Sequence, residues 1–421
     1  MARDSEERTE SQAEQAQEAT PGGARRDAGG GRRRRQEATV PSLLERGRQV
    51  LRRIGERFGR APRWIRFLVA AAAIALAAAL PGILPYLTSN SQYYTELLTK
   101  TGIAALLALG LNVVVGFAGL LDLGYVAFFA VGAYAFAILT GAAHYSIVTF
   151  SQLTGGATIP TWHAYTWLFF FAALAVAVCA GVVLGAPTLR LRGDYLAIVT
   201  LGFGEIVRIT ANNLDSVTDG AQGVTQIPHP QIDVGGIHYA FGIENAPYYW
   251  LLLAVIVAWI FLLRRINDSR VGRAWAAIRE DEVAAAAMGV PTVRMKLLAF
   301  AMGAAVASFG GVIFASQIAF IAPEQFTLFN VDYGSVIILA MVVLGGMGGL
   351  AGPILGAALI IFLPEQFRSL GDARLLVFGA VLVAVMIFRP QGLIPSRRRA
   401  AELTGHEIRD TSVFEVQEHA R

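Results

Sequence analysis

The acid–base pair set deepest inside an apolar run of this 421-residue sequence is formed by Glu205 and Arg208. The two residues are three positions apart, so on a helix they occupy neighbouring positions of one face and partly neutralise each other. Charges inside a membrane-spanning helix are costly, and they usually face the interior of a helix bundle or a wet pathway. The pair therefore predicts either a role in a translocation path or a structural ion pair near the outer interface.

No catalytic pattern accompanies this pair. Both lysines of the sequence, Lys100 and Lys296, lack the preceding glycines of a phosphate-binding loop, and no nucleophile elbow or His-Glu-x-x-His motif occurs. The single cysteine, Cys179, excludes an intramolecular disulfide, and no Cys/His spacing is typical of a metal site. We expect no catalytic residue, no metal and no cofactor bound by this chain, and we expect that it is not an enzyme.

The composition indicates a polytopic, all-α membrane protein. Hydrophobic residues make up 55% of the chain and charged residues 16%, the mean hydropathy is +0.51, and several apolar runs approach the bilayer-spanning length of about 20 residues. The net charge of +4 does not indicate a nucleic-acid partner, because the basic residues gather at membrane edges and in the N-terminal tail. The lipid bilayer is the expected partner of the apolar surface.

The arginines predict how these runs are oriented. Three loops predicted to be external, 144–164, 212–246 and 319–332, contain no Lys or Arg, so both termini are predicted to be cytoplasmic. Exceptions to this rule are Lys100, Arg208 and Arg374. Nine to eleven spans fit the pattern, with ten preferred: 64–87, 101–121, 123–143, 165–187, 194–211, 247–263, 295–318, 333–347, 352–368 and 374–389.

The chain divides into four predicted regions. Residues 1–40 are polar and predict a disordered, retained cytoplasmic tail rather than a signal peptide. Residues 41–63 predict a basic amphipathic juxtamembrane helix on the anionic leaflet, or merely a charged stop that fixes orientation. Residues 64–395 form the predicted transmembrane domain, and residues 396–421 a cytoplasmic C-terminal tail.

Between two apolar runs lies a charged, alanine-rich segment, residues 269–290, which we call the coupling segment. At a helical period it is amphipathic, with one stripe interrupted near its middle by Glu282. An unpaired buried carboxylate is unfavourable by several kcal/mol, which favours a helix that docks in a groove of another protein carrying a cation. A solvated loop helix is the alternative. The stripe comprises Val271, Trp275, Ile278, Ala285, Ala286 and Gly289.

Two glycine-rich turns recur, at Gly116–Leu120 and Gly346–Leu350, each ending one apolar run and opening another. Paired helix interruptions at membrane depth indicate internal repeats and a pathway between them, although glycines also serve close helix packing. The residues predicted to line a translocation path are Asn112, Gly116, Gly119, Glu205, Arg208, Gly346 and Gly349.

Several stretches resemble one family of membrane proteins. The segments 110–134, 190–208, 226–228 and 343–353, together with Arg279–Gly289, are similar to LivM-type permeases of branched-chain amino acid ABC importers. The resemblance covers residues 64–395 and implies a bacterial plasma (inner) membrane protein. Its implied partners are a second related permease, two ATPase subunits that carry the ATP and Mg, and an extracytoplasmic substrate-binding protein.

The resemblance also assigns a role to the coupling segment, which corresponds to the loop that docks a permease on its ATPase. Two departures are visible: Glu282 lies seven residues before Gly289 rather than at the family's usual spacing, and Thr218-Asp219-Gly220 replaces the usual Thr-Gly-Gly. The residues expected to contribute to coupling are Arg273, Trp275, Arg279, Glu280, Glu282, Ala284, Ala285 and Gly289.

The resemblance does not by itself specify the substrate, because related permeases carry several kinds of small solute. Leu121-Asp122-Leu123-Gly124-Tyr125 is more similar to branched-chain amino acid permeases, which favours leucine, isoleucine and valine over urea, amides or other amino acids. The expected mechanism is alternating access driven by ATP on the partners, with the coupling segment as a lever. An ion-coupled secondary transporter is a less favoured alternative, because it leaves the alanine-rich segment unexplained. An intramembrane enzyme is also less favoured, because it needs a reactive cluster that the sequence does not show.

Overall fold

A computed structural model describes residues 63–140, 162–188, 191, 193–234, 237–242, 244–367, 371, 373–388 and 392–394. The predicted N-terminal tail, nearly all of the juxtamembrane helix and the C-terminal tail lie outside the described residues.

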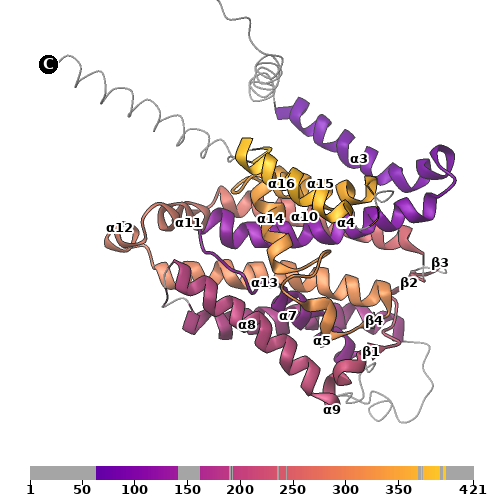
Figure 1. Ribbon diagram of the computed structural model, residues 1–421, viewed down its shortest axis with the longest axis horizontal. Helices are drawn as coiled ribbons and strands as arrows, with labels where there is room; N and C mark the ends of the chain where they lie inside the picture. The colour runs from indigo at the N-terminus through magenta and orange to yellow at the C-terminus, as the bar shows by residue number, and fades with distance from the viewer. Residues whose placement is uncertain are drawn as a thin grey trace, which may run out of the picture. The chain divides into compact units, whose positions relative to one another are not determined.

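The described chain is mainly helical (Figure 1), and each apolar stretch predicted to be a span contains a helix. Among the described residues, four helices are long and apolar enough to cross a membrane by themselves: Ser91–Phe117, Thr166–Thr188, Asn245–Asn267 and Thr292–Ile318. The longer helices are α3 (Arg63–Leu87), α4 (Ser91–Asn112), α5 (Val126–Leu139), α7 (Trp162–Thr188), α8 (Asp194–Asn213), α10 (Asn245–Asn267), α11 (Arg270–Glu280), α13 (Thr292–Ile318), α14 (Ser335–Gly345), α15 (Ala351–Gln366) and α16 (Ala373–Phe388).

Short elements connect these helices. They are the π-helical turn η1 (Val113–Phe117), α9 (Asp215–Thr218), η2 (Gly220–Gln222), α12 (Glu282–Ala287) and η3 (Pro323–Phe326). Two antiparallel two-stranded ladders add a little β structure: β1 (Val224–Thr225) pairs with β4 (Phe320–Ile321), and β2 (Gln231–Val234) pairs with β3 (Ile237–Ala240). The all-α prediction is therefore right for the apolar stretches, and the strands lie in the predicted external loops.

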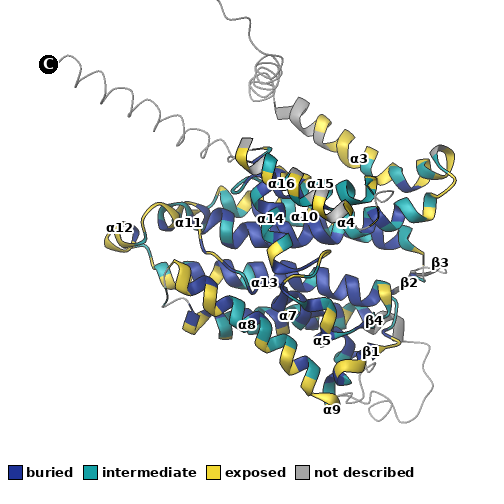
Figure 2. Ribbon diagram, in the orientation of Figure 1, coloured by how far each residue is buried: buried dark blue, intermediate teal, exposed yellow. Residues whose placement is uncertain are grey.

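Helix α13 is the centre of the core, packed against α5, α7 and α4. Its contact with α5 is close because both helices present glycine there: a Cβ on Gly311 would lie 2.2 Å from the Phe129 carbonyl oxygen, and one on Gly132 would lie 2.5 Å from Ser308 Cα. Such small-residue contacts let helix backbones approach without a hydrophobic driving force. Figure 2 shows α4 and α13 largely buried.

The surfaces of α7 and α10 have the opposite character. Both helices are strongly apolar, yet most of their residues are not buried within this chain, and large side chains such as Leu168, Phe171 and Phe261 are more than half exposed. A helix that is apolar all round and exposed needs an apolar surrounding, which a bilayer or a second membrane subunit supplies.

Between η1 and α5 the chain runs irregularly through the protein interior. Its polar groups are satisfied by side chains of other helices: Leu123 N donates to Thr200 Oγ1 at 3.1 Å, and Val126 N donates to Ser335 Oγ at 2.9 Å. The Tyr125 hydroxyl in turn donates to the Gly303 carbonyl at 3.1 Å. Non-helical backbone at membrane depth is tolerated where it is buried inside protein, as it is here.

Candidate functional site

The two glycine-rich turns, which the sequence relates only by similarity, lie in direct contact. The side chain of Asn112, fully buried, clamps them: its Nδ2 donates to the Gly349 carbonyl at 2.8 Å, and Gly348 N donates to its Oδ1 at 2.9 Å. A Cβ on Gly116 would lie 2.0 Å from Asn112 Oδ1 and 2.7 Å from Gly348 N. We call this contact the glycine junction, comprising Asn112, Gly116, Gly119, Gly346, Gly348 and Gly349.

The junction requires glycine because its backbone leaves helical geometry. Gly119, Gly346 and Gly348 have φ values of 72°, 115° and 79°, which residues with a Cβ rarely adopt. At the end of α14, Leu393 N and Ile394 N donate to the carbonyls of Leu344 and Gly345, both at 2.9 Å. These bonds satisfy carbonyls that a helix C-terminus leaves without partners.

Arg279 connects the coupling segment to the glycine junction. Its Nη1 donates to the Gly116 carbonyl at 2.8 Å, and a Cβ on Gly119 would lie 2.7 Å from Arg279 Cγ. The sequence placed Arg279 in the coupling set and Gly116 and Gly119 in the path set. In the structure the Arg279 side chain connects the predicted coupling residues to the predicted path residues.

The coupling segment is not one helix, which corrects the sequence prediction. The helix ends at Glu280, Asp281 is extended, and α12 begins at Glu282. The cause is local: the Asp281 carboxylate accepts hydrogen bonds from Val283 N at 2.8 Å and Ala284 N at 3.0 Å, which is an N-cap. The predicted stripe therefore holds for Trp275, Ile278 and Ala285 but fails for Ala286 and Gly289, which are exposed.

Glu282 finds its cation within this chain, which corrects the expectation that another protein supplies it. Its Oε1 lies 2.5 Å from Nζ of Lys296 on α13, and the Lys296 side chain is only 3% exposed. Trp275 is likewise held internally, with Nε1 donating to the Met295 carbonyl at 2.7 Å. Three predicted docking residues, Trp275, Glu282 and Ala285, thus face their own chain. Arg279 is exposed, although its Nη1 binds the Gly116 carbonyl of the same chain.

The remaining coupling residues are available at the surface. Arg273, Glu280, Ala284 and Gly289 are exposed, and Gly289 has a φ of 83° with open space where a Cβ would be. Two exposed apolar side chains lie beside them, Val283 on α12 at 62% and Met288, directly after α12, at 85%; neither is among the residues predicted from sequence. In the sequence, both are large apolar residues in a segment rich in charge and alanine, and that contrast is the signal that could have identified them.

Glu205 and Arg208 lie elsewhere, on α8. Arg208 Nε donates to Glu205 Oε1 at 2.9 Å, and its Nη2 also pairs with that oxygen. Arg208 Nη1 lies 3.6 Å from Oε1 of Glu324 on η3, a partner that sequence spacing could not reveal. This group of three charges is part of the α8–η3 contact and is separate from the glycine junction.

Comparison with known families identifies the protein family of the chain. The family described as branched-chain amino acid transport system / permease component matches residues 93–388. The chain belongs to this family. The match spans the glycine junction, the coupling segment and the Glu205–Arg208 pair, so all of these are parts of the permease.

Individual relatives agree with the family match. The permease is 40% identical over 339 residues to the high-affinity branched-chain amino acid transport system permease protein LivM of Salmonella typhimurium, covering 76% of this chain and 73% of the relative. It is 39% identical to LivM of Escherichia coli, covering 80% and 76%. The autoinducer 2 import system permease protein LsrC of Salmonella paratyphi B is 29% identical over 35% of this chain and 42% of its own. No solved structure matches the chain.

These relatives and the long apolar helices make the chain a multi-pass inner-membrane transport protein and not an enzyme.

Proposed function

We propose that the permease is the membrane-crossing subunit of an ABC importer that moves leucine, isoleucine and valine into the cell. The observation that carries this proposal is the 40% identity to a LivM permease over 73% of that protein. The match to an autoinducer 2 import permease is shorter and weaker. Because the match to LivM is longer and closer, we favour amino acids as the substrates of this chain.

The proposed assembly contains this chain, a second related permease, two ATPase subunits that bind ATP and Mg, and an extracytoplasmic binding protein. The chain itself is proposed to bind no cofactor, to span the membrane ten times and to have both termini in the cytoplasm. The exposed apolar surfaces of α7 and α10 support contact with lipid and with the second permease.

Docking on an ATPase is proposed for the exposed surface of the coupling segment. Arg273, Glu280, Ala284 and Gly289 provide its polar and small positions, and Val283 and Met288 provide buried area on binding. An apolar centre with a polar rim is the usual anatomy of a protein interface. Trp275 and Glu282 fix the segment to α13 so that it moves with that helix.

The path from the ATPase to the membrane is proposed to run through Arg279. Its hydrogen bond to the Gly116 carbonyl joins α11 to the turn at the end of α4, and Asn112 joins that turn to Gly348 and Gly349. Displacement of α11 by the ATPases therefore acts on both glycine-rich turns together. ATP supplies the free energy, so the spans need no proton relay.

The test is affinity purification of the tagged permease from mild-detergent extracts, with the co-purifying proteins identified by mass spectrometry. We expect ATPase subunits and a second permease, and we expect Met288→Arg to remove the ATPases while leaving the second permease bound. Leu214→Arg is the matched control, because Leu214 is an exposed apolar residue, at 42%, in the predicted external loop 212–246 and therefore away from the ATPases. Recovery of this chain alone, active by itself in liposomes, would instead establish an ion-coupled transporter.

A further inference from the structure

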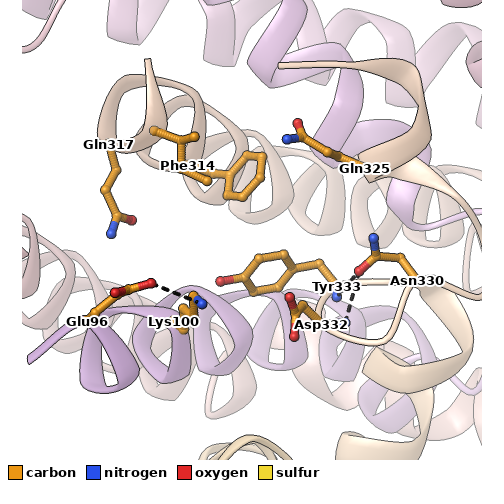
Figure 3. A pocket seen from close by; sticks show the side chains of 9 residues that line it. Glu96, Lys100, Phe314, Gln317, Gln325, Asn330, Asp332 and Tyr333 are labelled. Atoms are coloured by element: carbon orange, nitrogen blue, oxygen red, sulfur yellow. Dashed lines mark hydrogen bonds and ion pairs between the residues drawn. The ribbon is translucent and has the colours of Figure 1, made fainter. Parts of the chain in front are cut away.

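One pocket lies apart from the glycine junction and the coupling segment. It is a cavity of about 200 Å³ between α4, α13 and the loop from η3 to α14. Figure 3 shows the polar side chains of this pocket facing a common space from these different elements. A cavity of this size admits a small molecule rather than a single water. The lining residues used below are Glu96, Lys100, Phe314, Gln317, Ile318, Asp332 and Tyr333.

The floor of the pocket carries both signs of charge. Lys100 Nζ lies 3.1 Å from Glu96 Oε1, and both side chains are almost half exposed, so a small charged solute can reach them. Asp332 contributes a second, exposed carboxylate. The pocket thus presents one cation and two carboxylates, with a sum of −1, and this mixture of signs suits a solute that carries an ammonium together with a carboxylate.

The orientation of the chain in the membrane does not account for Lys100. It is one of the three cations that violate the distribution of Lys and Arg expected from the positive-inside rule. Lys100 also lies within Ser91–Phe117, a helix long and apolar enough to cross a membrane, and ionisable residues inside such helices are functional candidates by default.

Part of the pocket lining is apolar. Phe314 and Tyr333 pack edge to face, with ring centroids 5.5 Å apart at 76°, and Ile318 is 46% exposed. The loop that carries Tyr333 is fixed by Asn330, whose Oδ1 accepts hydrogen bonds from Asp332 N at 2.9 Å and Tyr333 N at 3.1 Å. Small-molecule sites combine an apolar lining with a few placed polar groups in this way.

We propose that this pocket is a transit site for the zwitterionic amino acid on its way through the membrane. Lys100 receives the α-carboxylate, Glu96 and Asp332 receive the α-ammonium, and the branched aliphatic side chain lies against Phe314 and Ile318. The two charged ends of the solute thereby meet opposite charges, and the wall of Phe314 and Ile318 selects for a hydrocarbon side chain. The inference rests on the proposed function, because it names where that function's substrate is held.

The first test measures leucine uptake and binding-protein-stimulated ATPase activity of the complete importer in proteoliposomes. We expect Lys100→Met and Asp332→Asn each to lower uptake by about tenfold, with stimulated ATPase activity retained. The matched control is Glu244→Gln, since Glu244 is an exposed carboxylate in a predicted external loop and lies outside the pocket. Uptake by both variants at the wild-type rate would overturn the transit site.

A second test does not depend on the variants assembling. Gln317→Cys is placed in a Cys179→Ser background, so that the pocket holds the sole thiol, and its labelling rate by a methanethiosulfonate reagent is measured in membranes. Leucine is expected to slow the labelling, and N-acetyl-leucine, which lacks the ammonium, is expected not to. Equal rates with and without leucine would overturn the proposal.

The two failures are distinguishable. If the wild-type importer does not take up leucine, the proposed function is wrong. If wild-type uptake is normal and the pocket variants and the labelling rate are unaffected, only the transit site is wrong.

Discussion

The Glu282–Lys296 pair predicts an unequal response to removing its two partners. Lys296 is 3% exposed and Glu282 is 24% exposed, with 2.5 Å between Nζ and Oε1. Glu282→Gln leaves the buried ammonium of Lys296 without that carboxylate, whereas Lys296→Met replaces the lysine stem with apolar volume and leaves a carboxylate that water already reaches.

The magnitudes follow from this difference in exposure. Removing one partner of a buried pair costs about 3–5 kcal/mol, and an exposed pair contributes at most about 1 kcal/mol. We therefore expect Glu282→Gln to lower the free energy of unfolding by about 3 kcal/mol and Lys296→Met by about 1 kcal/mol. The double variant is expected to resemble Lys296→Met, because no buried charge is left unpaired.

The assay is thermal unfolding of the purified permease in mild detergent, followed by circular dichroism. The melting temperature should fall most for Glu282→Gln, and adding Lys296→Met to that variant should restore part of the loss. If Lys296→Met is as destabilising as Glu282→Gln, the burial argument is refuted. If neither variant changes the melting temperature and both only release the ATPases, the carboxylate serves another protein, as the sequence first suggested.

Four further predictions concern the glycine junction, with two substitutions, the N-cap of α12 and the α8 pair. Asn112→Ala removes both bonds to the second glycine turn, and we expect a loss of about 2–4 kcal/mol in thermal unfolding, since buried polar groups lose their partners. Gly116→Ala is expected to lower stability and transport through the 2.0 Å overlap with Asn112 Oδ1, whereas Gly202→Ala, which meets nothing within 4 Å, is expected to leave both unchanged. Asp281→Ala is expected to destabilise α12 by about 1 kcal/mol through loss of its N-cap and to weaken ATPase retention in affinity purification without affecting the second permease. Glu205→Gln is expected to reduce transport if the α8 pair belongs to the path; normal transport with normal assembly would mean that the pair is structural.

The helices could be predicted from sequence because their signal is local. The apolar stretch 194–211 gave α8 (Asp194–Asn213) within two residues, and 295–318 gave α13 (Thr292–Ile318) within three. The break at Asp281 was also local and was missed, because an alanine-rich periodic pattern outweighed a capping residue in its middle. An aspartate that directly precedes a short run of helix-forming residues is by itself a signal for the start of a helix.

The partners of the site residues could not be predicted because they are distant in sequence. The cation of Glu282 is 14 residues away on another helix, and Glu324 approaches Arg208 from a separate loop. The sequence suggested that the two glycine-rich turns are related, yet nothing in it specifies that Asn112 bridges them. Tertiary packing determines these contacts, and one sequence without its fold carries no distance information.

The hydrogen bonds of Asn112 can form only late in the synthesis of the chain. Its partners Gly348 and Gly349 lie 236 and 237 positions later in the chain. At a synthesis rate of about 5–20 residues per second, the first glycine turn waits roughly 12–47 s for the second. Throughout that interval the Asn112 amide, which ends up fully buried, must find temporary partners, because an unsatisfied amide in hydrocarbon is unfavourable by several kcal/mol. A nascent chain interrupted before residue 348 therefore lacks the native partners of a polar side chain in its second predicted span.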